Sequence, residues 1–217
     1  RWTGWTSESH ESQEFSNHWA QGHETTAVIL QSATGSSVET LDAARHALDL
    51  GVLTVALTNT PGSVLEELCD ERICFSTGQR CGPDVSVLTT RLMMLYLLAL
   101  EIGAATGSLH NHEVEELGAA IGHLPDLAAQ FLEDEDLNVS QIANALKDQQ
   151  ALMLVGGGAN WFSAREGALK VEEESSLLCK TYRPAEYLHN AIPLLSEQVA
   201  TVVIAPPGKS YVRLSLD

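Results

Sequence analysis

Positive charge is scarce in this chain of 217 residues, and lysine above all. The sequence holds 12 Lys and Arg against 29 Asp and Glu, a formal net charge of −17, and its only lysines are Lys147, Lys170, Lys180 and Lys209. Nucleic-acid binding needs a basic face, so the composition argues against that class of function. A surface of this kind suits a high-salt cytoplasm, where self-repulsion is screened, although ordinary proteins also carry acidic surfaces; a halophilic source is therefore a hypothesis.

Long apolar runs are also missing. No run approaches the length of a membrane span, and the polar start, Arg-Trp-Thr-Gly, lacks the apolar core of a signal peptide. We therefore expect a cytoplasmic protein that does not bind a membrane. The chain has no initiator Met, and we expect it to be part of a longer protein.

The four cysteines form no metal-binding or redox motif. Cys69, Cys74 and Cys81 cluster loosely and Cys179 stands alone, so none belongs to a Cys-x-x-Cys pair. We expect reduced thiols, mostly buried, rather than disulfides. The pattern His-x-His-Glu at 110–113 can be read as a metal site, but a solvated turn between helices is the better interpretation, and we expect no metal.

Apolar runs that read as buried strands alternate with helical patterns. This order predicts an α/β fold, a three-layer αβα sandwich with a parallel sheet, built from two units repeated around residue 150. We expect Glu133-Asp134-Glu135-Asp136 to form a solvated linker between two helices, and Trp2, Trp5, Phe15 and Trp19 to act as packing anchors. The strands are expected at 27–31, 52–58, 72–75, 152–155 and 199–204, and the helices at 37–50, 62–69, 86–102, 112–132, 139–149 and 161–178.

The most informative segment is 32–41, Ser-Ala-Thr-Gly-Ser-Ser-Val-Glu-Thr-Leu. It follows the apolar run 27–30 and precedes a helical pattern through Leu41, Ala44 and Leu48. Such a strand–loop–helix unit aims backbone N–H groups and the positive end of a helix at one point, which suits a phosphate. The loop holds no Lys or Arg, so a small phosphomonoester fits better than a nucleoside triphosphate. The alternative is an ordinary Ser-rich turn that caps a helix.

This segment resembles the phosphosugar loop of the SIS (sugar isomerase) domain family, usually Ser-Gln-Ser-Gly-Glu-Thr-x-Asp-Thr-Leu. The positions of this chain that match the hydroxyls and the glycine of that motif are Ser32, Thr34, Gly35, Ser37 and Thr40. Glu39 stands for the Asp, whereas Ala33 replaces the Gln and Ser36 the Glu, so we expect one side-chain contact to the sugar to be missing. The next segment, 51–63, resembles the strand and Asn-x-x-Gly-Ser turn in the isomerase domain of glucosamine–fructose-6-phosphate aminotransferases.

A second resemblance lies in residues 152–189. An apolar strand leads into Gly156-Gly157-Gly158, where backbone can approach a ligand closely. Residues 164–173 then resemble the family's Glu-Gly-Ala-Leu-Lys-x-x-Glu helix, and 184–189 its Gly-Glu-Leu-Lys-His segment, with Asn190-Ala191 in place of the following Gly-Pro.

The second block can also be read from its periodicity. Glu166, Lys170 and Glu173 share one face of a helix. A solvated row of ion pairs is the ordinary interpretation of such a pattern, worth a few tenths of a kcal/mol per pair. The preceding glycine loop favours a row that faces a cleft at the carboxyl end of the sheet, where open α/β folds bind ligands.

The resemblance implies two tandem SIS units with a flavodoxin-like fold: residues 1–149, a first unit without its first strand plus connecting helices, and residues 150–217, a second unit truncated at its C-terminus. It implies an aldose–ketose isomerase or deaminase acting on an amino-sugar or ketose 6-phosphate, without a cofactor, and a homodimer with shared active sites. The implied catalytic residues are Glu173 as base, His189 for ring opening, and Lys170 and Glu166 beside them. Gly156 and Gly157 would lie near the sugar, and Ser32, Thr34, Gly35, Ser37 and Thr40 would bind the phosphate.

Two alternatives remain open. SIS domains also serve as sugar-phosphate sensors without turnover, although the presence of both Glu173 and His189 favours an enzyme. A fructosamine-6-phosphate deglycase is the other alternative.

Overall fold

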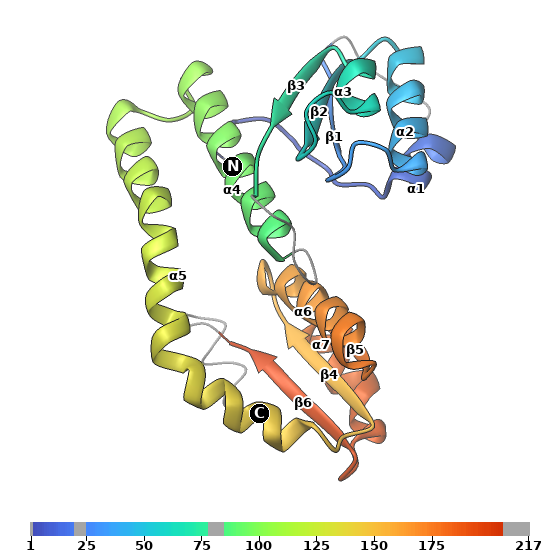
Figure 1. Ribbon diagram of the computed structural model, residues 1–217, viewed down its shortest axis with the longest axis vertical. Helices are drawn as coiled ribbons and strands as arrows, with labels where there is room; N and C mark the ends of the chain where they lie inside the picture. Colours follow the sequence, from blue (N-terminus) through green and yellow to red (C-terminus); the bar gives the residue numbers. More distant parts are fainter. Residues whose placement is uncertain (1, 20–24, 78–84, 206–217) are drawn as a thin grey trace. The chain divides into compact units, whose positions relative to one another are not determined.

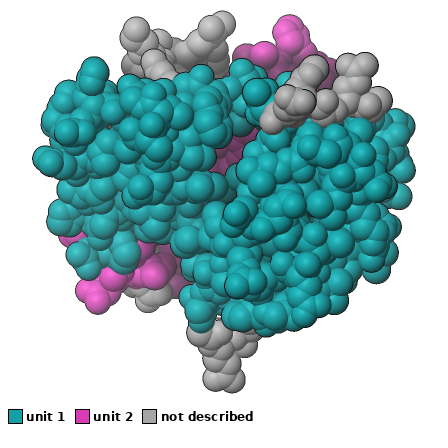
Figure 2. Space-filling model, turned by 90° about the horizontal axis from the view of Figure 1, so that it is seen from above, with its two compact units in different colours: residues 1–126 teal, residues 127–217 magenta. Residues whose placement is uncertain are grey.

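The computed structural model describes residues 2–19, 25–77 and 85–205. The chain divides into two compact units, Arg1–Asp126 and Leu127–Asp217, coloured teal and magenta in Figure 2. Each unit is described by itself below. The predicted boundary at residues 149 and 150 stays a prediction.

The first unit is built on a parallel three-stranded sheet (Figure 1). Its strands are β1 (Ala27–Gln31), β2 (Leu53–Thr58) and β3 (Glu71–Cys74), in the order β1-β2-β3. In the register Val28 pairs with Thr54, and Leu57 with Ile73. All three strands therefore end at one edge of the sheet, which is where ligands bind in folds of this class.

Helices cover both faces of this sheet. On one face, α1 (Ser12–His18), α2 (Val38–Asp49) and α3 (Val64–Leu68) pack on Leu30 and Ala56. On the other, α4 (Val85–Ala105) brings Val87 against Leu57 and Phe75. The alternation of inward side chains along each strand separates these two cores. The prediction of an α/β sandwich with helices on both faces is confirmed.

An aromatic contact fixes α1 on α2. The Phe15 ring is buried, stacks on Trp19 with centroids 5.0 Å apart, and meets the His46 ring edge-on at 5.6 Å. His46 Nε2 also lies 2.6 Å from the Trp19 carbonyl oxygen. Of the four expected anchors, Trp5 is the exception, because its side chain is 59% exposed.

α4 corrects one expectation. By length and composition it could cross a membrane, so the statement that no apolar run approaches a span is wrong for this helix. Such a helix is weak evidence for a membrane, because the core helix of a soluble protein passes the same test. The helix is only partly covered, since Leu92, Tyr96 and Leu97 are exposed whereas Val87, Leu100 and Gly103 are buried.

The predicted linker at 133–136 is wrong. These residues lie inside one continuous helix, α5 (Asn111–Leu146), which crosses the boundary between the two units. Glu is a good helix former, and no Gly or Pro interrupts 133–136, so an acidic run alone does not end the helix. Pro125 also lies inside α5.

The second unit has a parallel sheet of the order β5-β4-β6. Its strands are β4 (Ala151–Gly156), β5 (Leu178–Tyr182) and β6 (Val199–Ile204). α6 (Asn160–Ser175) packs through Ala164 and Ala168 on one face of the sheet. Short turns follow β5: α7 (Pro184–Glu186), a π-helical turn (Tyr187–Ala191) and a 3₁₀ turn (Ile192–Leu194).

β5 is absent from the sequence-based prediction, which continued the preceding helix to residue 178. The helix ends earlier because Ser176 adopts a left-handed backbone, with φ 57°. Glu172 then joins the two elements, since its Oε1 accepts a hydrogen bond from Cys179 N–H at 3.0 Å.

The described cysteines are free thiols, but they are not mostly buried as expected. Cys69 and Cys179 are half-buried and Cys74 is exposed. Partial burial raises the pKa of all three thiols, with Asp70, Glu66 and Glu172 adding negative charge nearby. Cys81 lies outside the described residues.

Candidate functional site

The predicted phosphate loop lies at the carboxyl edge of the first sheet, between β1 and α2. Ser32 continues the strand, because its N–H donates to Leu57 O at 3.2 Å. Ser32 and Gly35 are buried, whereas Thr34 and Ser37 are exposed at the loop surface. Thr40 is buried one turn into α2, with its hydroxyl 3.4 Å from Ser12 Oγ on α1.

The loop hydroxyls bond to one another in a pattern that leaves protons available. Thr34 Oγ1 accepts from both the N–H and the hydroxyl of Ser36, at 3.3 and 2.9 Å. Ser32 Oγ accepts from Gly35 N–H at 3.1 Å and lies 3.0 Å from Ser37 Oγ. A hydroxyl has one proton and two lone pairs, so the Thr34 proton and one proton of the Ser32–Ser37 pair can be donated to a ligand.

α2 adds backbone donors to this loop. Ser37 is its N-cap residue, but the side chain makes no capping hydrogen bond and pairs with Ser32 instead. The first N–H groups of a helix have no partners within the helix, and the helix dipole favours negative charge there. Glu39, exposed in the first turn, opposes an anion, so the neutral donors must supply the attraction.

The turn after β2 packs against the loop and is hydrogen-bonded to it. Gly35 has φ +63°, and a Cβ at this position would clash with Oγ and Cβ of Ser63. Leu65 N–H donates to Gly35 O at 3.0 Å, which ties the loop to the start of α3. Gly35 is therefore required both for its backbone conformation and for close packing.

The predicted catalytic row lies on one face of α6. Lys170 Nζ is 2.7 Å from Glu173 Oε2 and 3.7 Å from Glu166 Oε1, as the spacing predicts for residues three and four apart. The hydrogen bond to Glu173, reinforced by the charges of both glutamates, raises the pKa of Lys170. Lys170 therefore remains an ammonium group at neutral pH.

The glycines at the end of β4 have different neighbours. A Cβ on Gly156 would clash with the backbone of Asn160, so this glycine permits the chain to approach the first residue of α6. A Cβ on Gly157 would make only ordinary contacts, with side-chain carbons of Pro184 at 3.5 Å or more. The close approach at Gly156 is thus within the chain itself.

His189 lies in the π-helical turn after α7 and is exposed. No hydrogen bond or ion pair joins it to Glu166, Lys170 or Glu173 in the part of the chain that the structure describes. The segment is held instead by Glu186 Oε2, which accepts from Arg183 N–H at 3.1 Å, and by Tyr187 Oη, 3.0 Å from Thr201 Oγ1. Asn190 and Ala191 continue this helical turn.

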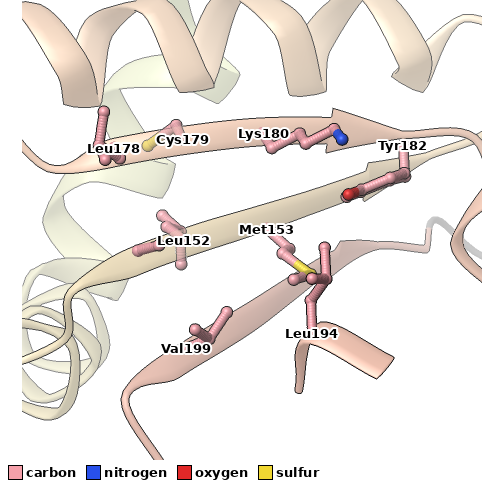
Figure 3. Close-up of a pocket in the computed structure, with 9 residues that line it drawn as sticks. Leu152, Met153, Leu178, Cys179, Lys180, Tyr182, Leu194 and Val199 are labelled. Atoms are coloured by element: carbon pink, nitrogen blue, oxygen red, sulfur yellow. The ribbon is translucent and has the colours of Figure 1, made fainter. Parts of the chain in front are cut away.

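A hollow of about 290 Å³ lies on the second sheet, away from these residues (Figure 3). Its lining is almost entirely apolar, and it includes none of the predicted site residues. Tyr182 Oη is buried there without a hydrogen-bond partner among the described residues, and Lys180 Nζ lies over the Tyr182 ring at 4.9 Å. The lining residues are Ala151, Leu152, Met153, Leu178, Cys179, Lys180, Tyr182, Leu194 and Val199.

Within each unit the predicted residues thus form one group: the hydroxyl loop in the first unit and the Glu166–Lys170–Glu173 row in the second. Among residues 2–19, 25–77 and 85–205, no group of three or more His, Cys, Asp and Glu side chains is placed to hold a metal ion. Glu113, from the metal-like pattern at 110–113, lies in the first turn of α5, and its Oε2 accepts a hydrogen bond from His110 N–H at 2.8 Å at the start of that helix.

Comparison with known proteins gives a consistent relationship. Residues 1–101 match the SIS domain family. Over 187 residues the chain is 31% identical to the isomerizing glutamine–fructose-6-phosphate aminotransferase of Gloeobacter violaceus, and over 188 residues 29% identical to that of Pyrococcus horikoshii. Each match covers 86% of this chain and 31% of the relative, so the chain spans about a third of their length.

Solved structures show the same fold. The C-terminal domain of glucosamine-fructose-6-phosphate aminotransferase from Francisella tularensis superposes with a TM-score of 0.87 at 21% identity, covering 93% of this chain and 57% of that one. The expectation of an α/β fold of this type is confirmed.

Proposed function

We propose, from the premise that this chain belongs to the SIS domain family, that it binds a small phosphosugar through the loop between β1 and α2. The observation that carries the proposal is the loop itself, in which buried and exposed hydroxyls converge with the uncapped start of α2. This arrangement offers neutral donors to a phosphate in a chain whose net charge of −17 would otherwise repel it.

We further propose that the bound sugar undergoes aldose–ketose isomerisation or deamination, as an amino-sugar or ketose 6-phosphate. The relatives named above are isomerizing aminotransferases that act on fructose 6-phosphate by name. In this proposal Glu173 removes and returns the proton between C1 and C2, and the Lys170 ammonium stabilises the negative charge that develops on the sugar oxygens. Glu166 holds Lys170, and His189 opens the sugar ring.

The charge pattern of α6 supports this division of roles. Lys170 is three residues from Glu173 and four from Glu166, and its ammonium lies nearer to Glu173. The Glu173 side chain is 44% exposed, so a ligand can reach its carboxylate beside the Lys170 ammonium. A homodimer in which two chains share their sites belongs to the same proposal.

The first experiment measures binding. Titration calorimetry of the full chain in high salt should detect fructose 6-phosphate or glucosamine 6-phosphate, and Thr34→Val should weaken that binding because it removes an outward hydroxyl. Thr106→Val is a matched control in the same unit, since its hydroxyl donates to Gly103 O at 3.3 Å, away from the loop. If neither sugar phosphate binds at millimolar concentration, the proposal is wrong.

The second experiment measures turnover. The full chain is incubated with fructose 6-phosphate plus ammonia, with glucosamine 6-phosphate and with fructosamine 6-phosphates, and products are separated by chromatography. Glu173→Gln should abolish turnover while leaving binding intact. Glu174→Gln, one residue further on the same helix, should keep it. Equal activity in both variants would remove Glu173 from the mechanism.

A sugar-phosphate sensor is the second candidate. It is favoured by one observation: no hydrogen bond or ion pair joins His189 to the Glu166–Lys170–Glu173 row in the part of the chain described here. A sensor would bind sugar phosphates with the same dependence on Thr34 and would turn over none of the substrates tested. Release of ammonia from glucosamine 6-phosphate would instead identify a deaminase, and release of an amino acid from a fructosamine 6-phosphate would identify a deglycase.

A further inference from the structure

We propose that the turn after β2 positions the phosphate loop, and that the Thr60 hydroxyl is the positioning group that holds the Thr34 N–H toward the phosphate. This inference rests on the proposed phosphosugar binding and assigns a residue that neither the motif nor the comparison with relatives identifies.

The Ala33 carbonyl is the point of attachment. Its oxygen accepts hydrogen bonds from Asn59 N–H at 3.1 Å, from Thr60 Oγ1 at 3.0 Å and from Thr58 Oγ1 at 3.4 Å. A carbonyl oxygen has two lone pairs, so three donors saturate it. All three donors come from the end of β2, and the orientation of the loop is therefore set by a tertiary contact.

The consequence for the ligand follows from peptide geometry. In a planar trans peptide the carbonyl and the next N–H point in opposite directions. Because the Ala33 carbonyl faces the β2 turn, the Thr34 N–H faces away from it. That N–H has no hydrogen-bond partner among the residues that the structure describes, so it is free to bind an anion. Rotation of this peptide would instead present a carbonyl oxygen to the phosphate.

The donors are themselves held in place. The Asn59 side chain makes two hydrogen bonds with Thr77. Asn59 Nδ2 donates to Thr77 Oγ1 at 3.1 Å, and Asn59 Oδ1 accepts from the backbone N–H of Thr77 at 3.1 Å. Thr58 is fully buried, and Asn59 uses its main chain, so neither donor can be removed cleanly. Thr60 is exposed, and Thr60→Val removes only its hydroxyl.

The test compares Thr60→Val, Thr60→Ser and the control Thr106→Val, an exposed Thr whose hydroxyl also donates to a main-chain carbonyl. Calorimetry of the full chain with fructose 6-phosphate and with inorganic phosphate should show about three- to tenfold weaker binding for Thr60→Val, the effect of one hydrogen bond. The affinities for the two ligands should fall by the same factor, because the phosphate is the only group that the two ligands share. Thr60→Ser should restore binding, and Thr106→Val should not change it.

The outcomes separate this inference from the proposed function. If the unmodified chain binds neither ligand, both are overturned. If it binds them and Thr60→Val binds equally tightly, or Thr60→Ser is as weak as Thr60→Val, only the positioning role is overturned. An unchanged melting temperature in Thr60→Val, together with weaker binding, supports positioning over a general loss of structure.

Discussion

Replacing Gly35 by Ala tests the packing on which the phosphate loop depends. The backbone at Gly35 has φ +63°, where an L side chain costs about 1–2 kcal/mol. The added Cβ would also clash with Ser63, and such overpacking typically costs about 1–3 kcal/mol. We therefore expect Gly35→Ala to destabilise the first unit by about 3 kcal/mol in total.

Two further variants separate the two costs. Gly51→Ala also places Ala at positive φ, +70°, but its Cβ would meet no atom within 4 Å, so it should cost only about 1–2 kcal/mol. Ser63→Gly removes the clashing atoms and loses only a weak N-cap hydrogen bond, from Glu66 N–H at 3.4 Å, worth a few tenths of a kcal/mol. When Ser63→Gly is already present, Gly35→Ala should lower the free energy of unfolding by no more than Gly51→Ala does.

The assay is native-state hydrogen exchange of the β1 and β2 amides, because these strands report the stability of the first unit alone. Measurements in high salt keep the acidic chain screened. The reasoning is refuted if Gly35→Ala costs no more than Gly51→Ala, or if the Gly35 and Ser63 substitutions are additive within about 0.5 kcal/mol.

Three other perturbations have defined outcomes. Phe15→Ala should destabilise the first unit by about 3–5 kcal/mol, read by the same hydrogen exchange, since the ring is buried against α2; a change below 1 kcal/mol would contradict that packing. Two donors from Thr54 lower the pKa of Asp70, so its contribution to stability is present above pH about 4 and is lost as pH falls through the lowered pKa. In Asp70→Asn the free energy of unfolding should therefore fall less steeply as the pH is lowered below about 4. An unchanged pH dependence in this range would exclude the contribution of Asp70. Glu173→Gln should lower the pKa of Lys170, as followed by NMR of its side chain, and an unshifted titration would show that the ion pair does not form in solution.

The strand–loop–helix unit around residues 27–50 could be predicted because local signals agree there. An apolar run, a Gly-containing hydroxyl loop and a helical period follow one another, and the structure has β1, the loop and α2 within one or two residues of those positions. The row on α6 was predictable for the same reason, since helical spacing alone brings Lys170 to Glu166 and Glu173.

Other features depend on contacts that a local pattern does not contain. β5 was missed because its identity as a strand comes from pairing with β4, and the helix before it stops at the left-handed Ser176. α5 was divided at an acidic run that is compatible with a helix. The role of the β2 turn was also hidden, because Ala33 and Thr60 are brought together only by the parallel pairing of β1 with β2.

The most direct test of phosphosugar binding is an NMR titration of the backbone amides with fructose 6-phosphate, inorganic phosphate and fructose. We expect the first two ligands to shift the N–H signals of Thr34 and of the first turn of α2, and fructose at the same concentration to leave them in place. Shifts confined to other parts of the chain, or equal shifts with fructose, would contradict a phosphate site at this loop.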